Sequence, residues 1–367
     1  MKCDVLIIGA GPAGLSSALM LSKKGFSTII LEKNKTVGPE YTKFDITEGY
    51  KIKKILEEIG VQPQKISQQS EWFSPNYSYV LDSRIEDFYF KRGPQEDSLE
   101  NILLKKLYEK NVNVFYKSII DSIKQEEKKI NTVRVNTTRE KITINPKYII
   151  SADGSDSELR KRLKIETKIF VKLEGFGTVI ETKKDDMIPF AKIYFDEKLA
   201  PGGYVYSGSV RKQAFFCIVI DNIFSKKISF GENLKKILKK NINTDFKVKN
   251  YFSGIGISGI SKPRFENVLF IGGAALLLDP FLGYGLNYAI ESAYTTVQAI
   301  AKNKIEIYTD YAKKIQSEFK KIYFVRKIWR NANNKFFDKL IEAFNGKIDR
   351  ENKKINKVLE LFYKNNV

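Results

Sequence analysis

Histidine is absent from this 367-residue chain, and cysteine occurs only twice, at Cys3 and Cys217. Without histidine there can be no His-ligated metal site, no Ser-His-Asp triad and no imidazole acting as general base. Two cysteines cannot form a disulfide framework or a cysteine-rich zinc site. We therefore expect no metal, and we expect difficult chemistry to come from an organic cofactor or from carboxylate, lysine and tyrosine groups. Cys3 begins a strand-like segment and Cys217 lies in the apolar run 215–220, which predicts that both belong to the core.

Long apolar stretches are also missing from the sequence. No segment approaches the ~18 consecutive apolar residues of a transmembrane helix, and residues 1–4 lead into a strand-like run without the features of a signal peptide. We therefore expect a cytoplasmic protein. Acidic residues are in deficit, with 43 Asp+Glu against 63 Lys+Arg, so the formal net charge is +20.

This charge admits two interpretations. A strongly basic chain is attracted to phosphates or to an anionic membrane surface, and the same excess also arises from lysines spread over an ordinary surface. No recognition motif accompanies the lysines, so we expect no nucleic-acid binding.

Three glycines near the N-terminus carry the first specific signal. Gly9, Gly11 and Gly14 have G-x-G-x-x-G spacing between a strand-like run at residues 5–8 and a helical pattern that ends near residue 25. Glycines there allow a tight turn, the approach of a pyrophosphate and close helix–strand packing, while the helix N-terminus attracts phosphate. Glu32 ends the next predicted strand, at 27–31, where a carboxylate would accept hydrogen bonds from a ribose. The predicted dinucleotide contacts are Gly9, Gly11, Pro12, Ala13, Gly14, Glu32 and Lys33.

Two later segments distinguish FAD from NAD. Residues 148–160 contain Asp153-Gly154 followed by Ser157 and Arg160, which resembles the D-G-x-x-S-x-x-R segment of flavin-dependent hydroxylases and their relatives. Residues 268–286 resemble the second FAD segment of that superfamily, a G-D-A-A followed by P-x-x-G-x-G, and lead into a predicted helix at 286–301. The resemblance assigns these further residues to FAD: Asp153, Gly154, Gly273, Asp279, Pro280, Gly283, Gly285 and Leu286.

Among proteins with these segments, the chain most resembles the geranylgeranyl reductase family, FAD enzymes that hydrogenate isolated double bonds of polyprenyl chains. The overall length of the chain is similar to that of the family. Residues 201–206 (P-G-G-Y-V-Y) are similar to the G-G-Y-x-W-x-F-P stretch that borders the substrate cavity of that family. The resemblance implies reduction of C=C bonds in a prenyl chain on an isoprenoid lipid or prenylquinone, with NAD(P)H or a reduced electron carrier as reductant. Tyr204 and Tyr206 become candidates for the cavity wall, with ordinary sheet packing as the alternative. The sequence identifies no catalytic residue.

The chain departs from the family pattern at several positions. Gly273 replaces an aspartate that holds a ribityl hydroxyl, and the loss of one charged hydrogen bond would cost about 1–3 kcal/mol of FAD binding; Asp279 is the candidate substitute. Tyr206 replaces the tryptophan, residues 207–208 replace Phe-Pro, and residues 37–41 lack the cysteine that many relatives carry. Arg92 precedes a predicted helix at 98–110. It either contacts the FAD pyrophosphate, as in relatives, or lies at the solvated surface.

These patterns predict an α/β fold, α+β overall. A Rossmann-like FAD-binding domain is expected at 1–165 and 262–305, with an inserted antiparallel-sheet substrate domain at 166–261 and residues 40–95 contributing to the substrate side. Residues 35–92 show no clear periodicity, and separate strands are predicted at 142–144 and 148–150. A basic helical region follows at 306–367. Its apolar helix face, expected to dock on the protein body or on lipid at an anionic membrane, comprises Phe336, Phe337, Leu340, Ile341 and Phe344.

Two other functions fit the same motifs. One is an aromatic-ring hydroxylase of the same superfamily, which would consume oxygen and NAD(P)H. The other is a non-catalytic binding protein that keeps the fold without tight flavin binding. The sequence does not determine the oligomeric state.

Overall fold

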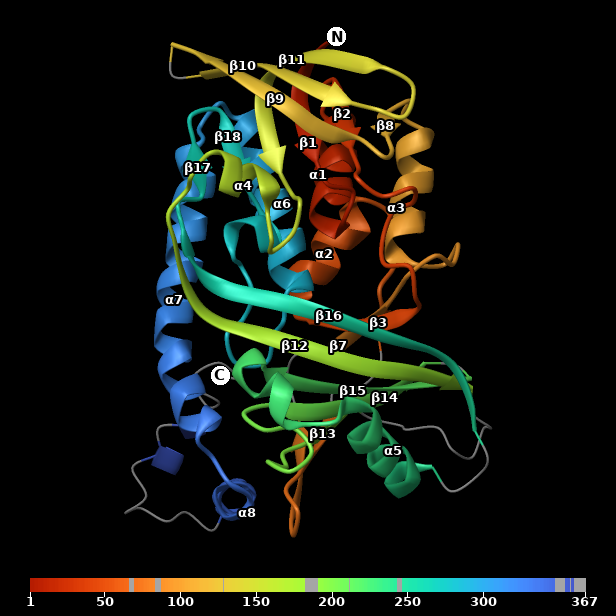
Figure 1. Cartoon of the computed structure of the whole chain (residues 1–367), viewed down its shortest axis with the longest axis vertical. Coiled ribbons are helices and arrows are strands. Elements are labelled where there is room, and N and C mark those ends of the chain that lie inside the picture. The colour runs from red at the N-terminus through yellow and green to blue at the C-terminus, as the bar shows by residue number, and fades with distance from the viewer. Residues whose placement is uncertain are drawn as a thin grey trace.

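The computed structural model describes residues 1–65, 69–82, 87–127, 129–181, 191–210, 212–242, 246–346, 354–356 and 358–359. An eight-stranded sheet and a seven-stranded sheet form its two main bodies, and a three-stranded sheet accompanies them. Figure 1 shows the long strands β12 (Thr167–Glu181) and β16 (Lys247–Ser261) crossing the middle of the molecule below the eight-stranded sheet. The predicted α/β class with a Rossmann-like half is confirmed.

The eight-stranded sheet has a parallel centre, in the order β18-β11-β1-β2-β8. Strand β1 is buried on both faces, since Val5 and Ile7 join one core cluster while Leu6 and Ile8 join another. This explains its unbroken apolar run. The strands of this sheet are β1 (Lys2–Ile8), β2 (Thr28–Leu31), β8 (Asn113–Phe115), β9 (Ile119–Glu126), β10 (Lys129–Asn136), β11 (Lys141–Ser151), β17 (Arg264–Phe265) and β18 (Val268–Phe270).

Helices cover one face of this sheet. Their apolar side chains share a core with Val5 and Ile7, and α1 packs between two neighbours, α3 and α6. Short turns of helix follow β11 and β18. The helices and turns of this half are α1 (Pro12–Lys23), α3 (Leu99–Tyr108), α4 (Glu158–Arg162), η3 (Gly272–Ala275) and α6 (Leu286–Ala301).

The seven-stranded sheet has the order β16-β12-β15-β14-β13-β5-β6. One face packs on α7 (Glu306–Arg330) and α8 (Asn334–Phe344), and the other packs on α5 (Phe230–Asn241), which follows η2 (Asn222–Lys227). Its remaining strands are β5 (Gln69–Phe73), β6 (Ser78–Asp82), β13 (Ala191–Tyr194), β14 (Tyr204–Val210) and β15 (Gln213–Asp221). The three-stranded sheet comprises β3 (Lys43–Glu48), β7 (Asp87–Arg92) and β4 (Gln64–Lys65), with α2 (Tyr50–Glu58) between β3 and β4.

Two local predictions are wrong. The strands predicted at 142–144 and 148–150 form one strand, β11, which changes partners along its length: Ile144 pairs with β10, and Tyr148 pairs with β1. Pro146 therefore does not end the strand. The region at 35–92, which has no clear periodicity, contains five strands and a helix among its described residues. Most of these strands pair with one another, as β3 does with β7 and β5 with β6, and β5 also pairs with the distant β13. The predicted domain boundaries stay a prediction.

Helix α8 docks on the protein body. Phe337, Leu340 and Ile341 are buried in the core of the seven-stranded sheet, and the Phe344 ring contacts Trp72 edge-on, with ring centroids 5.6 Å apart. The alternative that this face binds lipid is wrong. Residues 347–353, 357 and 360–367 of the predicted helical region lie outside the described residues. Within the described part of the chain, the helices are too short or too polar to span a bilayer.

Candidate functional site

The first glycine turn has close contacts at two positions and an open one between them. A Cβ added to Gly14 would lie 2.0 Å from the Gly9 carbonyl oxygen, and one added to Gly9, at φ +101°, would lie 2.5 Å from the Ala152 carbonyl oxygen. At Gly11 no atom of the described residues lies within 4 Å of such a Cβ, and no described side chain caps α1. The helix N-terminus therefore presents an open surface with free N–H groups, which fits a pyrophosphate.

Glu32 connects this turn to the end of β2. Its buried carboxylate accepts hydrogen bonds from the backbone N–H groups of Ala10 and Asn34, each at 2.8 Å. Lys33 beside it is exposed. The contacts of Glu32 and Lys33 with a ribose or phosphate stay predictions.

The Asp153 segment is fixed to the second FAD-type segment by an arginine. The Asp153 carboxylate accepts a hydrogen bond from the Leu159 N–H at 3.2 Å, at the start of α4. Arg160 donates to the carbonyl oxygens of Ala274 and Ser155, at 2.6 and 2.7 Å. Arg160 thus holds the two segments at a fixed spacing.

That spacing explains the glycine at position 273. A Cβ on Gly273 would lie 2.9 Å from the Ser155 nitrogen and 3.1 Å from its Oγ. An aspartate would therefore require the backbone to move. The glycine at this position, where the superfamily pattern has aspartate, fits this close approach.

The loop at 279–285 is stabilised by its own aspartate. Asp279 Oδ1 accepts from the N–H groups of Phe281 and Leu282, at 2.9 and 2.5 Å, and the Tyr204 hydroxyl donates to the Leu282 carbonyl. Burial raises the pKa of Asp279, against the opposing effect of these amides. Asp279 Oδ1 is thus already bonded to backbone N–H groups of the loop. That Asp279 takes over the role of the aspartate missing at position 273 stays a prediction. Helix α6 begins directly after Gly285, with no capping side chain among the described residues.

A cavity of about 960 Å³ joins these segments to the seven-stranded sheet. Six of the predicted cofactor residues line it, as does Arg92. The other nine do not line it: Gly9, Gly11, Ala13, Gly14, Glu32, Lys33, Asp153, Gly154 and Pro280. The lining residues from the cofactor side include Pro12, Ser155, Gly273, Asp279, Gly283, Gly285 and Leu286. The lining residues from the sheets and α7 include Lys43, Asp45, Trp72, Leu81, Leu173, Ile193, Tyr204, Tyr206, Cys217, Phe252 and Ile322.

Two tyrosines and a cysteine form one wall of the cavity. Tyr206 on β14 pairs directly with Cys217 on β15, and the Tyr204 and Tyr206 ring centroids are 6.2 Å apart. Burial raises the pKa of the Cys217 thiol to about 12 and that of Tyr206 well above its ordinary value. Burial likewise raises the pKa of Tyr204 well above its ordinary value, so all three side chains remain protonated at neutral pH. Both cysteines are buried as predicted, but Cys217 also faces the cavity.

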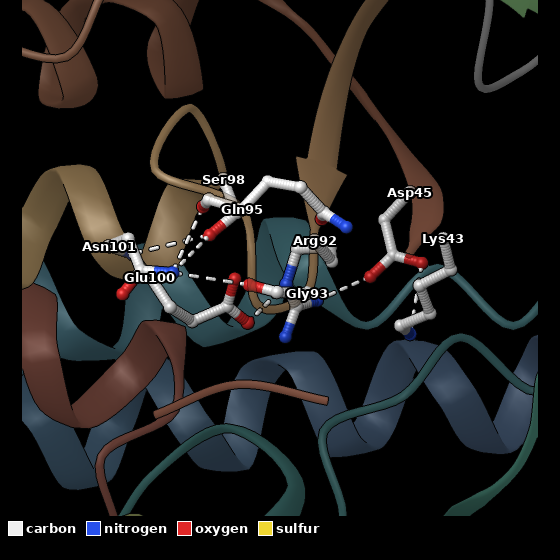
Figure 2. A network of polar contacts seen from close by, with 8 residues as sticks. All are labelled: Lys43, Asp45, Arg92, Gly93, Gln95, Ser98, Glu100 and Asn101. Carbon is white, nitrogen blue, oxygen red and sulfur yellow. Dashed lines mark hydrogen bonds and ion pairs between the residues drawn. The ribbon is translucent and has the colours of Figure 1, made fainter. Parts of the chain in front are cut away.

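A buried charge network forms the polar end of the cavity (Figure 2). Arg92 Nε lies 2.5 Å from Glu100 Oε1, another Arg92 nitrogen binds Asp45, and Lys43 Nζ lies 3.1 Å from Asp45 Oδ1. Burial alone would raise the pKa of Asp45, but the charges of Lys43 and Arg92 outweigh it and lower that pKa. The Arg92 side chain is only 12% exposed, so the surface alternative for it is wrong. Its contact with a pyrophosphate stays a prediction.

Sequence reasoning missed several of these groups. Lys43 and Asp45 alternate along β3, and Glu100 follows Leu99 on a helix whose face at Leu103 is buried. The available signal was that Glu100 falls on the buried side of this helix. That signal cannot be interpreted until Arg92 is known to lie opposite Glu100.

Comparison with known proteins agrees with this architecture. The family model described as "FAD binding domain" matches residues 2–305. A "Digeranylgeranylglycerophospholipid reductase 1" of Methanococcoides burtonii is 24% identical over 86% of this chain and 80% of its own length. A "Digeranylgeranylglycerophospholipid reductase 3" of Methanosphaera stadtmanae is 25% identical over 93% of this chain and 90% of its own. These relatives confirm the resemblance to geranylgeranyl reductases.

Solved structures share the fold. A geranylgeranyl bacteriochlorophyll reductase-like protein of Thermoplasma acidophilum superposes with a TM-score of 0.78 at 20% identity, covering 97% of this chain and 95% of that one. A p-nitrophenol 4-monooxygenase of Pseudomonas putida gives 0.75 at 16% identity, covering 100% and 98%. Because reductase and monooxygenase folds match almost equally well, the fold alone does not distinguish their reactions.

Proposed function

Because the chain belongs to the FAD binding domain family, we propose that it is an FAD-dependent oxidoreductase that reduces C=C bonds of a polyprenyl chain on an isoprenoid lipid or prenylquinone. The observation that carries the proposal is the position of the cavity. It runs from the predicted flavin loop at Gly283 and Gly285 to apolar groups such as Trp72 and Ile193. Its volume is at the upper end of the ~300–1,000 Å³ typical of small-molecule sites. The names of the relatives support the same chemistry.

Positioning carries most of the catalysis in this proposal. Reduced FAD, when bound, supplies a hydride. An isolated alkene has no carbonyl group that a hydrogen-bond donor could polarise, so the wall must hold one alkene carbon beside the flavin and exclude water. Leu173, Phe252 and Ile322 are apolar members of that wall.

The second alkene carbon requires a proton, and we assign it to the Tyr206–Cys217 pair. Both side chains line the cavity and remain protonated. The negative charge of Asp45 acts on both, and its partner Lys43 has a side chain that is 29% exposed.

Removal of the proton donors tests this assignment. Because general acid catalysis typically contributes ~10²–10⁴-fold, Tyr206→Phe or the double variant with Cys217→Ala should slow alkene reduction at least tenfold at unchanged FAD content. Cys3→Ala is the matched control, since Cys3 is buried in a different core cluster. Equal rates in the wild type and the double variant would exclude the pair as proton source.

The proposal also includes a reductant for the flavin and a membrane as the source of the substrate. NAD(P)H or a small electron carrier would reduce the flavin. The prenyl lipid would be taken from an anionic membrane, to which the +20 chain is attracted by charge.

An anaerobic incubation tests the proposed function. The FAD-loaded protein, reduced with dithionite, is mixed with a lipid that carries geranylgeranyl chains. We expect products heavier by one hydride and one proton per bond reduced. An unchanged lipid, together with oxygen uptake in a separate aerobic assay that is stimulated by an aromatic compound and NAD(P)H, would favour the hydroxylase instead. A purified protein that does not bind added FAD would indicate a non-catalytic binding protein.

A further inference from the structure

Arg326, on helix α7, is a buried cation with few partners. Its side chain is 0% exposed. One nitrogen, Nη1, donates to the Phe281 carbonyl oxygen at 3.2 Å. Nε and Nη2 have no hydrogen-bond partner within the described ranges of the chain. This is a costly arrangement, because a buried charge is normally paired and hydrogen-bonded.

Other arginines of the molecule are better satisfied. Arg330, one turn later on α7, places Nε and Nη2 each 2.7 Å from Asp221 Oδ2. Arg160 donates to two carbonyl oxygens. Burial lowers the pKa of Arg326 to about 10, so its guanidinium is still charged at neutral pH. The molecule therefore holds a positive charge inside without an ion-pair partner among the described residues.

The Arg326 guanidinium is separated from the cavity by the backbone of the loop that it contacts. Phe281, whose carbonyl binds Arg326, lines the cavity together with Leu282 and Gly283. The same loop leads into the N-terminus of α6, which carries partial positive charge and no described side-chain cap. Two sources of positive potential thus converge on the loop that resembles a flavin-binding segment.

We infer that Arg326 stabilises the negative charge that bound FAD acquires on reduction, and that it thereby raises the reduction potential of the flavin. Uptake of two electrons and one proton leaves reduced FAD with one negative charge. A fixed cation in a low-dielectric site stabilises such a charge without reorganisation. Arg326 acts through the loop and is a positioning residue. The inference rests on FAD binding and is independent of the prenyl substrate.

The midpoint potential of the FAD-loaded protein tests this inference. Arg326→Met removes the charge and retains apolar volume, while Arg326→Lys retains the charge. We expect Arg326→Met to weaken the preference for reduced over oxidised FAD at least tenfold, which is about 30 mV for a two-electron couple. Arg326→Lys should stay near the wild-type potential. Arg330→Met is the matched control: it should lower stability and leave the potential unchanged.

Two results would overturn the inference. One is an unchanged potential in Arg326→Met, which would leave Arg326 a structural residue. The other is an equal fall in Arg330→Met. If Arg326→Met does not fold, Asp279→Asn/Arg326→Met is compared with Asp279→Asn, because the double variant removes the cation together with a buried carboxyl group whose charge acts on it. The titration uses dithionite and a reference dye without lipid, so its outcome does not depend on the proposed reaction.

Discussion

At the scale of single residues, the buried ion pair between Arg92 and Glu100 contributes to stability. Glu100 is fully buried, and its carboxylate depends on Arg92. Because a buried charge without its partner is strongly unfavourable, Arg92→Leu should lower the free energy of unfolding by about 3–5 kcal/mol. Urea denaturation measures this change. Arg92→Leu/Glu100→Leu should recover most of the loss, and a double variant no more stable than Arg92→Leu would contradict the pairing.

Position 273 gives a second prediction at this scale. Gly273→Asp restores the residue that the superfamily carries, and sequence comparison alone would suggest tighter FAD binding. The 2.9 Å approach to the Ser155 nitrogen predicts the opposite. We expect a loss of about 1–3 kcal/mol in stability from overpacking and no gain in FAD affinity, as measured by thermal unfolding and fluorescence titration. Tighter FAD binding at wild-type stability would refute this explanation of the glycine.

At the scale of elements, β1 and α1 build the cofactor end. Gly14 and Gly11 make different contacts in the same turn, and this difference is testable. Gly14→Ala should prevent stable folding, since its Cβ would overlap the Gly9 carbonyl. Gly11→Ala should unfold at nearly the wild-type temperature, because no described atom lies near its Cβ, yet bind FAD at least tenfold more weakly. Unchanged FAD affinity in Gly11→Ala would place the pyrophosphate elsewhere.

The sequence predicted elements whose signals are local. The strand at residues 5–8, the glycine turn and the helix at 286–301 all carry short-range patterns, and the structure contains each of them. Strand β5 could not be found in this way, because its residues show no clear alternation and one of its two partners is distant: Trp72 pairs with Tyr79 on β6 and with Ile193 on β13, far along the chain. The roles of Arg326 and Glu100 were also inaccessible, because the burial of a charge depends on how distant helices pack.

At the scale of the whole molecule, the cavity exists because two sheets meet. The parallel sheet supplies the loops that resemble FAD-binding segments, and the seven-stranded sheet supplies an aromatic wall. Figure 1 shows α7 extending along both bodies. Arg326 and Ile322 on this helix therefore lie close to the cavity.

The central claim is that a prenyl chain in this cavity accepts a hydride from FAD. The most direct measurement is the visible absorption of the anaerobically reduced, FAD-loaded protein after a lipid with geranylgeranyl chains is added. We expect that the absorption of oxidised flavin returns without oxygen, in proportion to the double bonds lost, and does not return with the saturated lipid. A flavin that stays bleached with the unsaturated lipid and reoxidises only in air would contradict the account.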